Sequence, residues 1–140
     1  MIKLNKIWFL VSSVAIFIIL IFQLSCGGSA VSSSTDIVFP ASNVSYIKQV
    51  QPFLKVTCAY QGCHADETMA ANISLTTYAS LSAGAGLGLV VWEKPMNPDH
   101  CRLVQIIELK VPHSYSYIWK INDNQKQGIR KWILEGANNN

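Results

Sequence analysis

Two cysteines and a histidine stand close together in the segment Cys58-Ala-Tyr-Gln-Gly-Cys63-His64. Thiols that add across the two vinyl groups of a porphyrin form thioether links, and an imidazole directly after the second cysteine can coordinate the iron. We therefore predict that Cys58 and Cys63 attach one haem c covalently and that His64 is its proximal iron ligand. The chemistry that such a group supplies is one-electron transfer.

The spacer between the cysteines has four residues, whereas the common attachment motif has two. On a straight helix a five-residue separation would turn Cys63 by roughly 140° from Cys58. The segment must therefore bulge for both thiols to reach one macrocycle. Gly62 lacks a Cβ and supplies backbone freedom at the position just before Cys63.

Two other interpretations of the same cysteines stay open. A Cys58–Cys63 disulfide would close a small loop. A zinc site would need two further ligands, and the remaining candidates are His100, Cys101 and His113. If haem takes the first two thiols, Cys101 is left over, and we expect it to be buried and inert.

Residues 1–25 predict a secretory signal peptide, because a start with two lysines precedes an apolar run at residues 7–22 that is short for a spanning helix. Cys26 then follows Leu-Ser and precedes two glycines, as the lipid-modified cysteine of a bacterial lipobox does, although Gln23 stands where an aliphatic residue is usual. We expect an exported protein in the periplasm or at the outer membrane, held to the membrane by a lipid on Cys26. An ordinary signal peptide cut nearby is the alternative.

The chain from Cys26 onward is almost neutral, with nine basic and eight acidic residues and a formal charge of +1. That balance leaves no basic surface for nucleic acid, so no nucleic-acid partner is expected. The serine-rich composition after Cys26 predicts a flexible tether over residues 26–42. The remaining length suits one small domain, residues 43–140.

Two amphipathic segments bracket this domain. In the first, Ile47, Val50 and Leu54 recur at helical intervals, Ser45 or Asn43 can cap the helix, and Pro52 marks a break or a restart. We expect this helix to run directly into Cys58 and to pack on the second helix and on the porphyrin.

The second segment is a predicted helix that Asn122-Asp-Asn can cap and Gly136 can stop. Ile129, Trp132 and Ile133 share one face of this helix, and we expect the Trp132 side chain to pack in the hydrophobic core. Between the two helices, the glycine-rich stretch at residues 83–89 does not follow a phosphate-binding pattern, and we expect a loop that passes close to the haem.

The order of these segments resembles the small c-type cytochrome domains of exported bacterial proteins, some of which use a four-residue spacer. The resemblance spans residues 43–140 and is most specific at the haem segment and at the final helix ending in Trp-Ile-Leu-Glu-Gly-Ala. It implies a mostly α-helical, cytochrome c-like domain around one haem. It also implies electron transfer to redox partner proteins in the cell envelope.

In such domains the distal iron ligand is commonly a methionine followed by proline, ahead of the last helix. The corresponding place here is Val-Pro-His113-Ser-Tyr, so we predict His113 as the distal ligand and keep Met96, in Lys-Pro-Met-Asn-Pro, as the alternative. A second imidazole gives a lower potential than a thioether. If neither residue binds, an open iron position would suit a haem enzyme or sensor, and without haem the chain would be a disulfide-containing binding lipoprotein.

Overall fold

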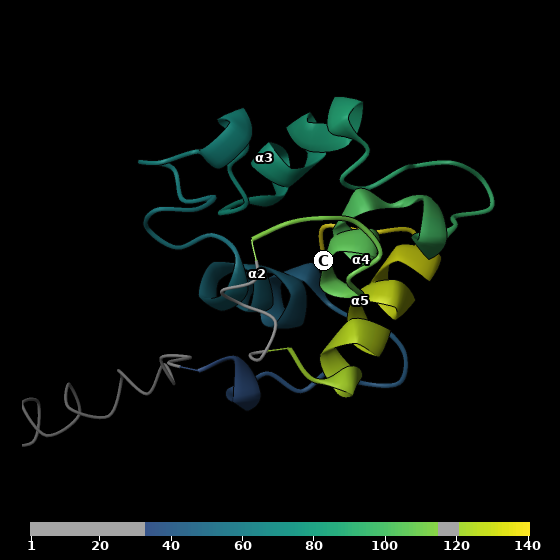
Figure 1. The fold of residues 1–140 in the computed structure, drawn as a ribbon. Coiled ribbons are helices and arrows are strands. Elements are labelled where there is room, and N and C mark those ends of the chain that lie inside the picture. The colour runs from purple at the N-terminus through teal and green to yellow at the C-terminus, as the bar shows by residue number, and fades with distance from the viewer. Residues whose placement is uncertain (1–32, 115–120) are drawn as a thin grey trace, which may run out of the picture. The chain divides into compact units, whose positions relative to one another are not determined.

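Short helices joined by turns form the part of the chain that the computed structural model describes, residues 33–114 and 121–140 (Figure 1). The predicted signal peptide and Cys26 lie outside these residues. Within them there is no strand, and none of the helices is long and apolar enough to cross a membrane. The prediction of a mostly α-helical domain is confirmed. The elements are η1 (Ser34–Asp36), η2 (Tyr46–Val50), α2 (Gln51–Thr57), η3 (Ala70–Asn72), α3 (Tyr78–Ala83), η4 (Gly84–Leu87), η5 (Pro98–His100), α4 (Arg102–Ile107) and α5 (Asp123–Leu134).

The first amphipathic segment starts as predicted but buries a different face. Ser45 caps it by accepting a hydrogen bond from the Lys48 N–H, and Pro52 lies in the first turn of α2, where the helix restarts. The residues before this restart form a π-helix, whose turn is wider than that of an α-helix. The wider turn directs Tyr46 into the core and leaves Ile47 60% exposed, so the prediction that Ile47 packs inward is wrong.

The second segment, α5, agrees with its prediction. The Asn122 side chain accepts a hydrogen bond from the Gln125 N–H, and the Gln125 side chain accepts one from the Asn122 N–H, which makes a capping box. Ile129, Trp132 and Ile133 are all fully buried. The helix ends just before Gly136, whose φ of +104° lies in the region that glycine favours.

The segment ahead of η2 packs against α5. Ile37 and Phe39 are buried, and Phe39 exchanges two backbone hydrogen bonds with the Asn124 side chain, at 2.8 and 3.0 Å. Gly128 faces the Phe39 ring so closely that an added Cβ would lie 2.1 Å from it. The folded unit therefore begins before Asn43, and the predicted tether is corrected for residues 33–42.

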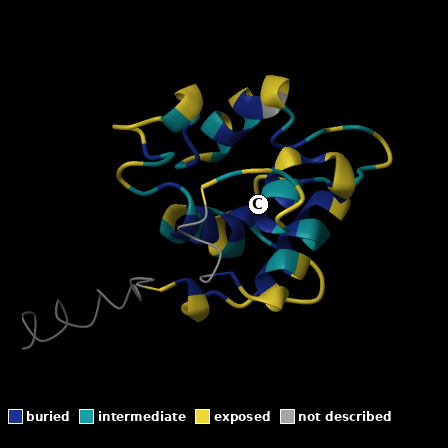
Figure 2. Cartoon of the chain, viewed as in Figure 1, coloured by how far each residue is buried: buried dark blue, intermediate teal, exposed yellow. Residues whose placement is uncertain are grey.

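The C-terminal tail holds the start of η2 in place. The Glu135 carboxylate accepts hydrogen bonds from the N–H groups of Asn43 and Val44, both at 2.9 Å. The Asn140 carbonyl accepts one from the Ile47 N–H at 3.0 Å. These contacts join the two predicted amphipathic segments. Figure 2 shows buried residues on α2, α4 and α5, and these residues belong to one hydrophobic core.

Candidate functional site

A cavity of about 330 Å³ opens beside the segment that carries Cys58, Cys63 and His64. Its volume lies within the range of about 300–1,000 Å³ that is usual for cofactor pockets. The walls are mainly apolar and come from the end of α2, from residues 71–75, from the glycine-rich stretch and from α4. A flat apolar group with few polar substituents is the kind of ligand that such walls suit.

The segment from Cys58 to His64 folds into a bulge. Cys58 ends α2, with its N–H donating to the Leu54 carbonyl at 2.8 Å. The chain then turns through Gly62, whose φ is +89°, and the Cys63 N–H donates to the Tyr60 carbonyl. The His64 N–H closes the loop by donating to the Cys58 carbonyl at 3.1 Å. The predicted role of Gly62 in this turn agrees with its positive φ.

Both cysteine side chains of this segment line the cavity and are partly buried. The cysteines among the described residues are free thiols. Burial raises the pKa of the Cys58 thiol to about 11, and the neighbouring Cys63 contributes to the rise. A thiol with such a pKa is almost entirely protonated at neutral pH.

The imidazole rings of His64 and His113 face the same cavity, with ring centroids 5.9 Å apart and ring planes inclined by 38°. The His64 Nδ1 donates to the Ile73 carbonyl at 3.1 Å, and the His113 Nδ1 donates to the Ser114 carbonyl at 3.3 Å. In a neutral imidazole this leaves the lone pair on Nε2. Two imidazoles that share one metal ion through Nε2 need centroids roughly 6 Å apart, since each metal–nitrogen bond is about 2 Å. The separation of the two rings is therefore compatible with one metal ion between them.

The other residues that the sequence offered as ligands lie elsewhere. Met96 packs against the core and is absent from the cavity wall. His100 contacts the Glu93 carboxylate at 2.6 Å, and the Cys101 Sγ accepts a hydrogen bond from the Val91 N–H at 3.3 Å. Cys101 is fully buried, as expected. Residues 33–114 and 121–140 contain no group of three or more metal-ligating side chains, so the zinc alternative is not assembled there.

A hydroxyl–carboxylate cluster, which the sequence analysis missed, holds the segment behind His64. Asp66 accepts hydrogen bonds from the hydroxyls of Ser74 and Thr76, at 2.6 and 2.8 Å. These bonds hold the pKa of the Asp66 carboxyl below its usual range. Together with the Leu75 N–H, which donates to the His64 carbonyl at 3.0 Å, they place the Ile73 carbonyl at the His64 ring.

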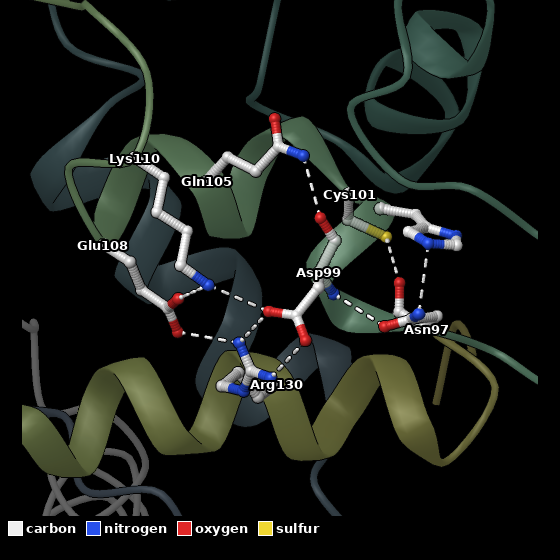
Figure 3. Close-up of polar contacts among 8 residues, drawn as sticks. Asn97, Asp99, Cys101, Gln105, Glu108, Lys110 and Arg130 are labelled. Carbon is white, nitrogen blue, oxygen red and sulfur yellow. Dashed lines mark hydrogen bonds and ion pairs between the residues drawn. The ribbon is translucent and has the colours of Figure 1, made fainter.

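A second missed cluster fixes the wall formed by α4 (Figure 3). Arg130 of α5 contacts both oxygens of Asp99, at 2.9 and 3.2 Å, and also contacts Glu108 at 3.0 Å. Lys110 contacts the same two carboxylates. This four-residue ion network joins both ends of α4 to α5, directly ahead of the chain segment that carries His113. No pattern in the sequence connects residues so far apart.

The glycine-rich stretch, which was expected to be a loop, contains η4 and reaches the cavity. Leu87 and Leu89 line it, and Leu89 is tied to α4 because its carbonyl accepts a hydrogen bond from the Leu103 N–H at 3.1 Å. Gly84 allows the close approach of Leu89, whose Cδ1 would lie 2.3 Å from an added Cβ. The stretch thus forms one wall of the site.

No family model, curated protein or solved structure compared with this chain matches it.

Proposed function

We propose that this chain is a c-type cytochrome that carries single electrons in the cell envelope, with one haem c bound in the cavity described above. The observation that carries the proposal is the 5.9 Å separation of the His64 and His113 rings, beside two thiols at the attachment spacing. His113 is 49 residues after His64 in the chain, so only the fold could bring the two rings together.

Each cavity residue has a role in this proposal. Cys58 and Cys63 would hold the porphyrin through thioether links, while His64 and His113 would coordinate its iron. The bound haem supplies one-electron chemistry. The hydrogen bond from the His64 Nδ1 to the Ile73 carbonyl orients the ring. The mainly apolar walls suit the flat macrocycle of a haem.

The proximity of His113 supports an electron carrier over a haem enzyme or sensor, because an enzyme needs an iron position that substrate can reach. It also favours His113 over Met96 as the distal ligand. The potential would then be lower than that of a carrier with a methionine ligand. Export and a lipid on Cys26 remain part of the proposal, with redox proteins of the cell envelope as partners and the membrane reached through the lipid.

The test is to produce the full chain in a bacterium that has a cytochrome c maturation system and to measure its intact mass. We expect the added mass of one haem and a Soret band. Replacing Cys58 or Cys63 by alanine should abolish stable double attachment, and the double variant should lose haem staining on a denaturing gel.

Unchanged haem staining in the Cys58→Ala, Cys63→Ala double variant would contradict covalent attachment. A parent chain whose intact mass does not include the tetrapyrrole would contradict the cytochrome proposal as a whole. In that case an intact mass lower than that of the reduced chain by two hydrogen atoms would identify the disulfide-containing form.

A further inference from the structure

Among the described residues that line the cavity, Arg102 is the one with a permanent charge. It is exposed and begins α4, so it lies at the rim of the cavity rather than in its depth. The Arg102 N–H donates to the Gly88 carbonyl at 2.7 Å, which fixes the backbone of the residue against the glycine-rich wall.

No carboxylate of the chain neutralises Arg102. All eight acidic residues lie within residues 33–114 and 121–140, and none of the ion pairs found there includes Arg102. The two cations near the far end of α4 differ in this respect, because Lys110 and Arg130 are shared between Asp99 and Glu108. The guanidinium at the rim is therefore available to an anionic group of a ligand.

We propose that Arg102 binds a propionate carboxylate of the haem and so determines which edge of the macrocycle faces the α4 rim. This inference rests on the proposed function and adds the orientation of the cofactor to it. A guanidinium suits the task because its planar fork of N–H donors matches a carboxylate in two parallel hydrogen bonds. The thioether links at Cys58 and Cys63 would then fix one edge of the ring and Arg102 another.

The charge of Arg102 gives the pairing a measurable signature. A propionate whose charge is neutralised does little to stabilise ferric iron, whereas an uncompensated one stabilises it and lowers the reduction potential. Loss of the guanidinium should therefore shift the midpoint potential downward. A residue with only a structural role would not produce a shift that depends on the sign of its charge.

The experiment compares the haem-loaded full chain with three variants by spectroelectrochemical titration. Arg102→Gln should lower the midpoint potential, and Arg102→Lys, which keeps the charge, should recover most of the shift. Lys48→Gln is the matched control, because Lys48 is an exposed cation that does not line the cavity. The change in midpoint potential of Lys48→Gln measures the effect of removing one positive charge from the surface.

A shift in Arg102→Gln no larger than that in Lys48→Gln would overturn the inference, and so would an Arg102→Lys value equal to that of Arg102→Gln. The glutamine variant could also be recovered without haem while the lysine variant is loaded. That result would mean that haem attachment itself requires a positive charge at position 102, and it would support the pairing. A parent chain without haem is a different failure, since it ends the proposed function together with this inference.

Discussion

The His64 imidazole donates its Nδ1 proton to the carbonyl oxygen of Ile73, at 3.1 Å. This contact joins the segment from Cys58 to His64 to the segment held by Asp66. It also determines which ring nitrogen carries the lone pair in the neutral imidazole. The side chain offers Nε2 as a ligand because the opposite nitrogen is bound to the backbone. A ligand arrangement of this kind makes the spectrum of the haem-loaded chain a direct test of the site.

His113→Ala should convert the haem-loaded chain from a low-spin to a high-spin spectrum, because the second imidazole would be lost from the iron. Met96→Ala is the matched control, since Met96 lies outside the cavity wall. Ferric and ferrous absorption spectra provide the measurement. The reverse result, with a spin change only in the Met96 variant, would rule out His113 as the distal ligand.

Gly128→Ala should destabilise the fold by about 1–3 kcal/mol, because the new methyl group would overlap the Phe39 ring and force repacking. Gly86→Ala is the control: no atom lies within 4 Å of its added Cβ, and we expect a change below about 0.5 kcal/mol. Chemical denaturation of each variant measures the difference. Equal free energies of unfolding would mean that Phe39 does not pack on α5.

Gln125→Ala should cost about 1–3 kcal/mol, because the fully buried Gln125 amide donates to the carbonyls of Ser34 and Ile37, which would be left without that donor. We also expect the segment 33–39 to become the first site of proteolytic cleavage. Limited proteolysis followed by mass mapping checks this. Cleavage at the same rate in parent and variant would show that Gln125 does not hold the segment.

The ion network of Figure 3 should make the protein sensitive to acid. Hydrogen bonds from Arg130 and Lys110 hold the pKa of Asp99 well below its usual range. A lowered pKa stabilises the folded state above the unfolded value of about 3.9, and this contribution is lost as the pH falls below that value. Stability should therefore drop in the acid range, and Asp99→Asn should flatten that part of the profile.

Thermal unfolding measured between pH 2 and pH 7 checks this expectation. Glu67→Gln, at an exposed position outside the network, is the control and should keep the slope of the parent. An unaltered acid slope in Asp99→Asn would indicate that solvent screening removes the effect of the network.

Short-range signals allowed much of the local structure to be predicted. Four predicted features each depend on only a few neighbouring residues: the cap at Asn122, the helix end at Gly136, the restart of the helix at Pro52 and the turn at Gly62. The local pattern did not predict that Ile47 is exposed. Its spacing fitted an α-helical face, but the π-helical turn, held by Asn140 at the other end of the chain, changed which side chain points inward.

The sequence by itself determined the chemical groups of the candidate site: two thiols and a histidine that no fold could separate, because the chain joins them within seven residues. Tertiary structure alone decided that His113, and not Met96, reaches the cavity. It also decided that residues 33–42 belong to the folded unit and that Asp99 forms an ion pair with Arg130. The physical reason is that each of these outcomes depends on packing between distant segments, whose energy no local pattern of residues encodes.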